Sequence, residues 1–247
     1  MTLPYKKNLR CALCENEATF TGIHSTNDLG SPDLDTKPSQ MRRSSIFAWV
    51  QRCPVCGYCA SDVSKVQPEF ESLICEDITA QEEQGHEATA WALIHAAWVC
   101  DSDEYRRQLI DNKFPELANS FLCKAIIDQE AQNYKSAAWA LIHAAWVCDD
   151  AALFEKAVIC RDKAADMLIT AEQHDQQIGE QDVTSTAILI DLLRRSGRMD
   201  DATRAIAKRR LGITEDVILR ILDFQASLIL KDDMLCYTIS EALKNDA

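Results

Sequence analysis

The sequence predicts a mainly α-helical protein in which a small, β-rich zinc-binding module precedes a helical-repeat array. Two Cys-x-x-Cys pairs lie within the first 60 residues, a pattern typical of a zinc site. Near residue 65, segments rich in Pro, Gly, Ser and Asp give way to long stretches with few glycines and helical spacing of apolar residues. A twelve-residue segment also occurs twice in this second part. We therefore expect two domains, residues 1–65 and 66–247.

Short strands and one long loop are expected in the first domain. Residues 18–23 and 45–51 are rich in Thr, Phe, Ile, Val and Trp, which favour strands. The intervening segment 27–38 contains Gly30, Pro32 and Pro38, so we predict that it is largely loop.

The second domain is predicted to be helical throughout. We expect helices at 69–84, 86–100, 115–131, 134–149, 151–174, 182–196, 200–210 and 214–230, with a short segment near the end. Residues Ala90–Asp101 recur without change as Ala138–Asp149, 48 positions later. Repeats of this size indicate stacked helix pairs.

Composition and charge disfavour several classes of protein. The apolar stretches are shorter than the roughly 20 residues of a membrane span, and Met1–Arg10 lacks the apolar segment of a secretory signal. We therefore expect a cytoplasmic protein without membrane contact, whose 11 cysteines bind metal or stay as free thiols. The formal net charge is −13, while residues 1–60 hold seven Lys/Arg against five Asp/Glu, so the acidic remainder is unsuited to nucleic acid.

Four cysteines are the predicted ligands of one structural zinc ion: Cys11, Cys14, Cys53 and Cys56. Each Cys-x-x-Cys turn presents two thiolates to one ion, and the form Cys-Pro-x-Cys-Gly favours a tight turn. The alternatives are four unligated thiols or a redox pair. Four thiolates would leave no open position for water, so we expect no hydrolytic chemistry at this metal.

Cys59 follows the second pair by three residues. We expect it to pack beside the turn, since four ligands already satisfy zinc. It could instead replace a ligand or belong to a second site.

Each copy of the repeated segment places two tryptophans and one histidine on one helix face, at positions i, i+4 and i+7. The residues are Trp91, His95 and Trp98 in the first copy, and Trp139, His143 and Trp146 in the second. Such a stripe is usually part of a core, and we favour this interpretation. The alternative is a binding stripe.

The turns of the second domain resemble those of tetratricopeptide repeats. Residues 133–137 and 196–202 place a large side chain and then an alanine three positions later, as that repeat does. Together with residues 31–38 and 49–60 and the repeated helices, this resembles a bacterial family of uncharacterised zinc-ribbon proteins with tetratricopeptide-like tails, catalogued as a domain of unknown function. The resemblance implies a fold and a metal, but no reaction.

Three functions are compatible with these patterns. We found no phosphate-binding glycine loop, Gly-x-Ser-x-Gly elbow or His-Glu-x-x-His helix, so we expect no enzyme. The leading hypothesis is a non-catalytic scaffold that binds a protein or peptide on its helices. A nucleic-acid-associated regulator that uses basic residues of the zinc ribbon ranks second, and a thiol or metal sensor that uses Cys59 ranks third. The sequence does not indicate an oligomeric state.

Overall fold

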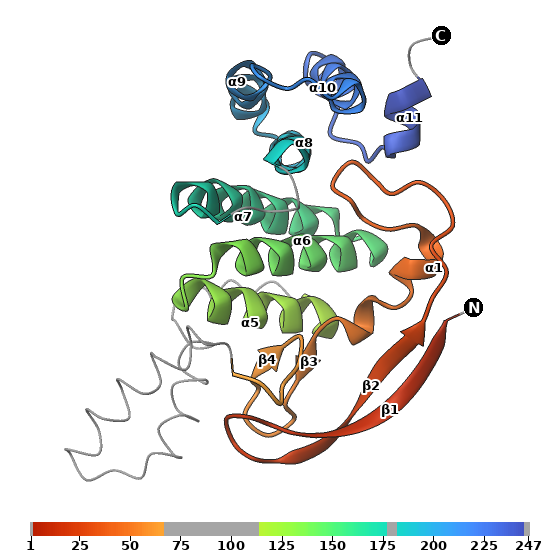
Figure 1. Cartoon of the computed structure of the whole chain (residues 1–247), viewed down its shortest axis with the longest axis vertical. Coiled ribbons are helices and arrows are strands. Elements are labelled where there is room, and N and C mark those ends of the chain that lie inside the picture. Colours follow the sequence, from red (N-terminus) through yellow and green to blue (C-terminus); the bar gives the residue numbers. More distant parts are fainter. Residues whose placement is uncertain (1, 67–113, 177–181, 245–247) are drawn as a thin grey trace, which may run out of the picture.

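The computed structural model describes residues 2–66, 114–176 and 182–244 (Figure 1). It shows a mainly helical molecule with a small β module and a cysteine cluster at the N-terminal end, as the sequence predicts. The predicted helices at 69–84 and 86–100, with Trp91, His95 and Trp98, lie outside the described residues. None of the described helices is long and apolar enough to cross a membrane.

The N-terminal module consists of two small antiparallel sheets and two short helical segments. Strands β1 (Leu3–Arg10) and β2 (Glu17–Ser25) form a hairpin, followed by α1 (Gln40–Arg43), the 3-10 turn η1 (Ile46–Ala48), and the short strands β3 (Gln51–Arg52) and β4 (Cys59–Ala60). β1 was not predicted from the sequence. The strand predicted at 45–51 is wrong, because the Ser45 and Ile46 carbonyls accept hydrogen bonds from residues three positions later.

The helical part is a series of helices in which neighbours along the chain pack on one another. These are α5 (Glu116–Glu130), α6 (Tyr134–Asp150), α7 (Phe154–Gln173), α8 (Asp182–Arg195), α9 (Met199–Arg209), α10 (Asp216–Ile229) and α11 (Ile239–Lys244). Figure 1 shows α6 between α5 and α7. Buried alanines on α6, such as Ala138 and Ala144, allow both neighbours to approach closely.

Three pairs of consecutive helices, α5–α6, α6–α7 and α8–α9, are joined by turns of one kind. Gln132, Ala152 and Gly197 each adopt a positive φ just after a helix, and the next residue donates a backbone hydrogen bond to a carbonyl five positions earlier. This hydrogen bond pairs a carbonyl group at the end of the helix, and the following helix begins at the next residue. The same turn therefore recurs at three of the connections in the array.

The 27–38 loop runs across the ends of the helices instead of remaining in the N-terminal module. Leu34 N donates to Tyr237 O and Ile239 N donates to Pro32 O, both at 2.9 Å. Figure 1 shows this segment extending from the β module toward α10 and α11. The loop therefore ties the two ends of the chain to the helical array.

Candidate functional site

The two Cys-x-x-Cys pairs form turns with matching hydrogen bonds. In the first turn, Glu15 N donates to Cys11 O at 2.9 Å, and in the second, Gly57 N donates to Cys53 O at 3.0 Å. Glu15 and Gly57 both have positive φ, of 58° and 77°, which reverses the chain after the second cysteine of each pair. Glycine suits this conformation at position 57, whereas Glu15 adopts it at a small steric cost.

The four predicted ligands lie together, with their sulfur atoms within 4.8 Å of one another: Cys11, Cys14, Cys53 and Cys56. The Cys11 and Cys56 sulfurs are 3.7 Å apart, and the Cys14 and Cys53 sulfurs 3.5 Å. A tetrahedron of sulfurs about 2.3 Å from a central ion has edges of about 3.8 Å. The site could therefore hold one metal ion with four thiolate ligands.

Burial and mutual repulsion disfavour four free thiolates at this cluster. Burial raises the pKa of Cys11 and of Cys56 above the usual range of a thiol. At Cys53 burial also raises the pKa, but hydrogen bonds from the backbone N–H groups of Cys56 and Val55, together with those of the Cys14 and Cys56 thiols, lower the pKa to about 7. Four adjacent thiolates would repel one another, and a bound metal ion removes that cost.

Cys59 does not belong to the four-thiol cluster. Its side chain is 1% exposed, and its sulfur donates to the carbonyl of Gly57 at 3.2 Å. The thiol thus packs beside the second turn.

An aromatic cluster lies where the N-terminal module meets α5 and α6, and we call it the junction cluster: Trp49, Phe121, Trp139, His143 and Trp146. The His143 ring is at its centre, with centroid distances of 5.2 Å to Trp49, 5.2 Å to Phe121, 5.9 Å to Trp139 and 4.9 Å to Trp146. Burial, and then the charge of Lys124, lower the pKa of His143 to about 3. The cluster is therefore uncharged at neutral pH.

Exposure divides the α6 stripe. Trp146 is 2% exposed and its indole N–H donates to Asp35 at 3.0 Å, so it belongs to the core. Trp139, His143 and Trp49 are only half-buried. The stripe therefore has a core end and a partly open end.

Two adjoining cavities meet at the open end, and we call them together the junction groove. One, of about 340 Å³, is lined by residues that include Ser61, Lys124 and Lys135. The other, of about 330 Å³, is lined by residues that include Asp28 and Arg42. Both linings include Trp49, Trp139 and His143, so these three side chains form a wall that the two cavities share.

Residues 4–211 match the model of a family described as an uncharacterized protein conserved in bacteria, DUF2225. The chain belongs to this family. The DUF2225 match includes both Cys-x-x-Cys turns, the junction cluster and helices α5 to α9. No curated protein and no solved structure matches the chain.

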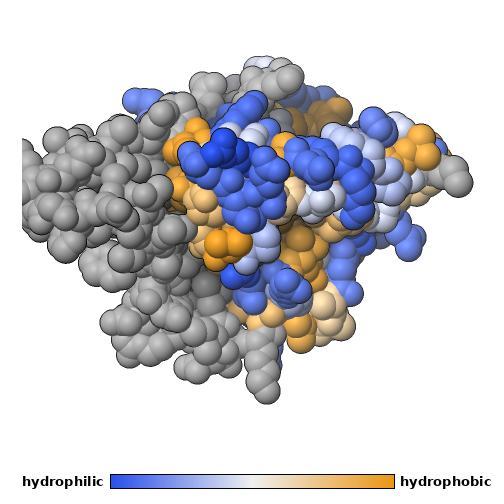
Figure 2. All heavy atoms as spheres, turned by 90° about the horizontal axis from the view of Figure 1, so that it is seen from below, coloured by the Kyte–Doolittle hydropathy of each residue, from blue (hydrophilic) through white to orange (hydrophobic). Residues whose placement is uncertain are grey.

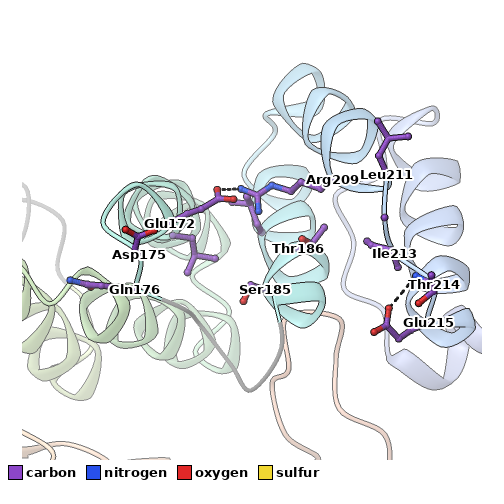
Figure 3. Close-up of a pocket in the computed structure, with 13 residues that line it drawn as sticks. Glu172, Asp175, Gln176, Ser185, Thr186, Arg209, Leu211, Ile213, Thr214 and Glu215 are labelled. Atoms are coloured by element: carbon purple, nitrogen blue, oxygen red, sulfur yellow. Dashed lines mark hydrogen bonds and ion pairs between the residues drawn. The ribbon is translucent and has the colours of Figure 1, made fainter.

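A third cavity, of about 510 Å³, lies between α7, α8 and the segment before α10 (Figure 3). Its lining reaches a few residues beyond the part of the chain matched by DUF2225. Arg209 on α9 pairs with Glu172 on α7 at one side of it, and Thr214 N donates to Glu215 at 3.2 Å. None of the predicted site residues within 2–66, 114–176 and 182–244 lines this cavity. It is therefore separate from the junction groove.

Two residues important at the junction were missed by sequence reasoning. Trp49 was assigned to a strand, although a tryptophan four positions before Cys53 was a signal that this segment packs close to the metal turn. Asp35 was assigned to an ordinary loop, yet its carboxylate is 0% exposed and accepts from Trp146 and from Arg195, each at 3.0 Å. No local pattern distinguishes it from the exposed Asp28 in the same loop.

Proposed function

We propose that this protein is a zinc-stabilised, non-catalytic adaptor that binds a protein ligand in the junction groove. The observation that carries the proposal is the half-buried pair Trp49 and Trp139, which come from different parts of the chain and line two adjoining cavities. Tryptophan is enriched among residues that dominate protein interfaces, because its large ring buries much area with few rotatable bonds.

Zinc is the metal that we propose for the four-thiolate site. Zinc accepts four soft ligands in a tetrahedron, and a site closed by four protein ligands is structural. No ligand position is left for water, so the metal would stabilise the fold and take no part in a reaction. We place the protein in the cytoplasm, where thiols stay reduced and available to a metal.

The helical array supplies a rigid support for the groove. Its helices pack with the same turn between α5 and α6 as between α8 and α9, which agrees with the tetratricopeptide-like geometry we expect. On the face seen from below, apolar residues of the described parts form separate groups among hydrophilic ones (Figure 2). A hollow lined by aromatic rings encloses more of a ligand's surface than such separate apolar groups do.

Site-specific photo-cross-linking in bacterial cells tests the adaptor function. A photoreactive residue replaces Lys135, at the wall of the groove, in the full-length protein. The same residue at Phe154, which is 66% exposed on α7 and lines neither cavity of the groove, is the matched control.

We expect a defined protein adduct from position 135 that disappears when Trp139→Ala is added, while the adducts from position 154 do not change. Circular dichroism of the purified variants establishes that the fold is retained, and metal analysis should give one zinc per chain. Adducts from position 135 that persist in the Trp139→Ala protein would contradict the proposal. So would equal labelling from both positions.

A further inference from the structure

The junction groove has the shape of a site for an extended chain. Its two cavities, of about 340 and 330 Å³, are similar in size and share the wall formed by Trp49, Trp139 and His143. An amphipathic helix needs one continuous apolar trough for side chains at i, i+3, i+4 and i+7. Two similar hollows on either side of an aromatic wall suit a ligand that places separate side chains in successive hollows.

The chemistry of the wall favours proline. Aromatic rings bind proline rings by apolar contact, and a polyproline II segment is already extended, so it loses little conformational entropy on binding. His143 is uncharged at neutral pH because burial lowers its pKa to about 3. The wall therefore offers apolar faces without a charge that would need solvation.

The same surroundings disfavour a cationic ligand, which aromatic rings can also bind. Lys124 lines the first cavity, and its charge contributes to the low pKa of His143. Among the residues that the structure describes, the charged side chains in the two linings are three cations, Lys124, Lys135 and Arg42, and one carboxylate, Asp28. This excess of positive charge occurs in a chain whose formal net charge is −13.

The cations differ in how far they are already paired. Arg42 forms an ion pair with Asp28 at 2.9 Å, and Lys124 pairs with the buried Asp128. Lys135 has no ion pair within the described parts of the chain. Its ammonium group can therefore pair with a carboxylate of a ligand that extends out of the first cavity.

From these observations, and resting on the proposed function of the groove, we infer that the ligand is an extended, proline-containing peptide segment flanked by acidic residues. Proline rings would occupy the two cavities on the sides of the Trp49–Trp139 wall, and an aspartate or glutamate would pair with Lys135. The ligand class is a protein segment in polyproline II conformation, bound without any covalent step.

Selection from a random peptide library tests this inference, because every class of short peptide competes for the groove on equal terms. Decapeptides displayed on phage are selected on the full-length, zinc-loaded protein, after removal of phage that bind the Trp139→Ala variant. We expect the enriched peptides to share two prolines, with Asp or Glu at the flanks. Enrichment of peptides without proline, of lysine-rich peptides or of helix-forming peptides would overturn the inference.

Binding of one enriched peptide is then measured by fluorescence anisotropy. We expect about thirtyfold weaker binding for Trp139→Ala, which corresponds to an interface contribution of about 2 kcal/mol. Lys135→Glu, a surface change that leaves the wall intact, should weaken binding of the acidic peptide and improve binding of a variant peptide with lysine flanks. Phe154→Ala is the control and should bind as the wild type does.

The two proposals fail in different ways. If the cross-link at position 135 depends on Trp139 but the selected peptides lack proline, the adaptor function stands and the inferred ligand class is wrong. If no peptide is enriched and the cross-link does not depend on Trp139, both are wrong. If the Lys135→Glu variant binds the acidic and the lysine-flanked peptides equally well, Lys135 does not pair with the acidic flank of the ligand.

Discussion

Replacing Asp35 with asparagine tests whether the 27–38 loop is part of the helical core. The Asp35 carboxylate is 0% exposed and accepts hydrogen bonds from the Trp146 indole on α6 and the Arg195 guanidinium on α8, each at 3.0 Å. Arg161 on α7 lies 3.6 Å from the same oxygen. One loop residue thus contacts three consecutive helices.

The change keeps the shape of the side chain and removes its negative charge. Arg195 is only 7% exposed, so it would lose one of the carboxylates that compensate its buried charge. Breaking a buried ion pair costs about 3–5 kcal/mol, and because asparagine retains one acceptor we expect about 3 kcal/mol. At about 2–4 °C per kcal/mol for chains of this size, the melting temperature should fall by about 6–12 °C.

Thermal unfolding followed by circular dichroism, with urea titration as a second measure, gives the free energy of unfolding. The matched control is Asp28→Asn in the same loop, because the pair of Asp28 with Arg42 is exposed on both sides and should contribute nothing measurable. We expect one cooperative transition in both variants. A melting temperature for Asp35→Asn equal to that of Asp28→Asn would refute the reasoning.

Three further predictions concern the metal and the junction cluster. Cys53→Ser should lose the metal and lower the melting temperature of the whole chain, whereas the equally buried Cys59→Ser should keep one zinc in metal analysis; metal loss in both would be inconsistent with the four-thiol site. Because the pKa of His143 falls from 6.5 to about 3 on folding, the unfolded chain binds more protons between these values, and stability is lost as the pH falls below about 6.5. His143→Gln should remove about 1–2 kcal/mol of the loss between pH 7 and pH 5, measured by urea unfolding with excess zinc, and an unchanged pH profile would argue against a neutral His143. Trp146→Ala should cost about 3–5 kcal/mol in thermal unfolding and Trp139→Ala less than half of that, since only the first indole is fully buried; equal losses would place both residues in the core.

The features that the sequence predicted correctly depend on short-range patterns. The helical array follows from apolar residues that recur at helical spacing in segments such as Glu116–Glu130 and Tyr134–Asp150. The cluster of four cysteines follows from the Cys-x-x-Cys spacing, which allows two sulfurs of one turn to face one site. Such patterns do not depend on distant parts of the chain.

The features that the sequence did not predict depend on distant partners or on unusual backbone conformations. Asp35 bonds to residues 111 and 160 positions away, and no local pattern encodes such a separation. The helix turns at Gln132 and Ala152 use positive φ without glycine, so the usual signal for this conformation appears only at Gly197. The segment at Ile46–Ala48 has strand-like composition but forms a 3-10 turn, because tertiary packing places Ile46 and Val50 in the core.

The second Cys-x-x-Cys turn and the junction groove are connected by a very short segment of chain. Trp49 supplies one side of the groove wall, and Val50, Gln51 and Cys53, which follow it, are all buried. Cys53 N donates to Tyr58 O at 2.8 Å, so the end of this segment is hydrogen-bonded within the second turn. A metal ion bound by the four cysteines would therefore help to hold Trp49 against His143 and Trp146. A structural metal in this protein would control the shape of a binding groove without contacting the ligand.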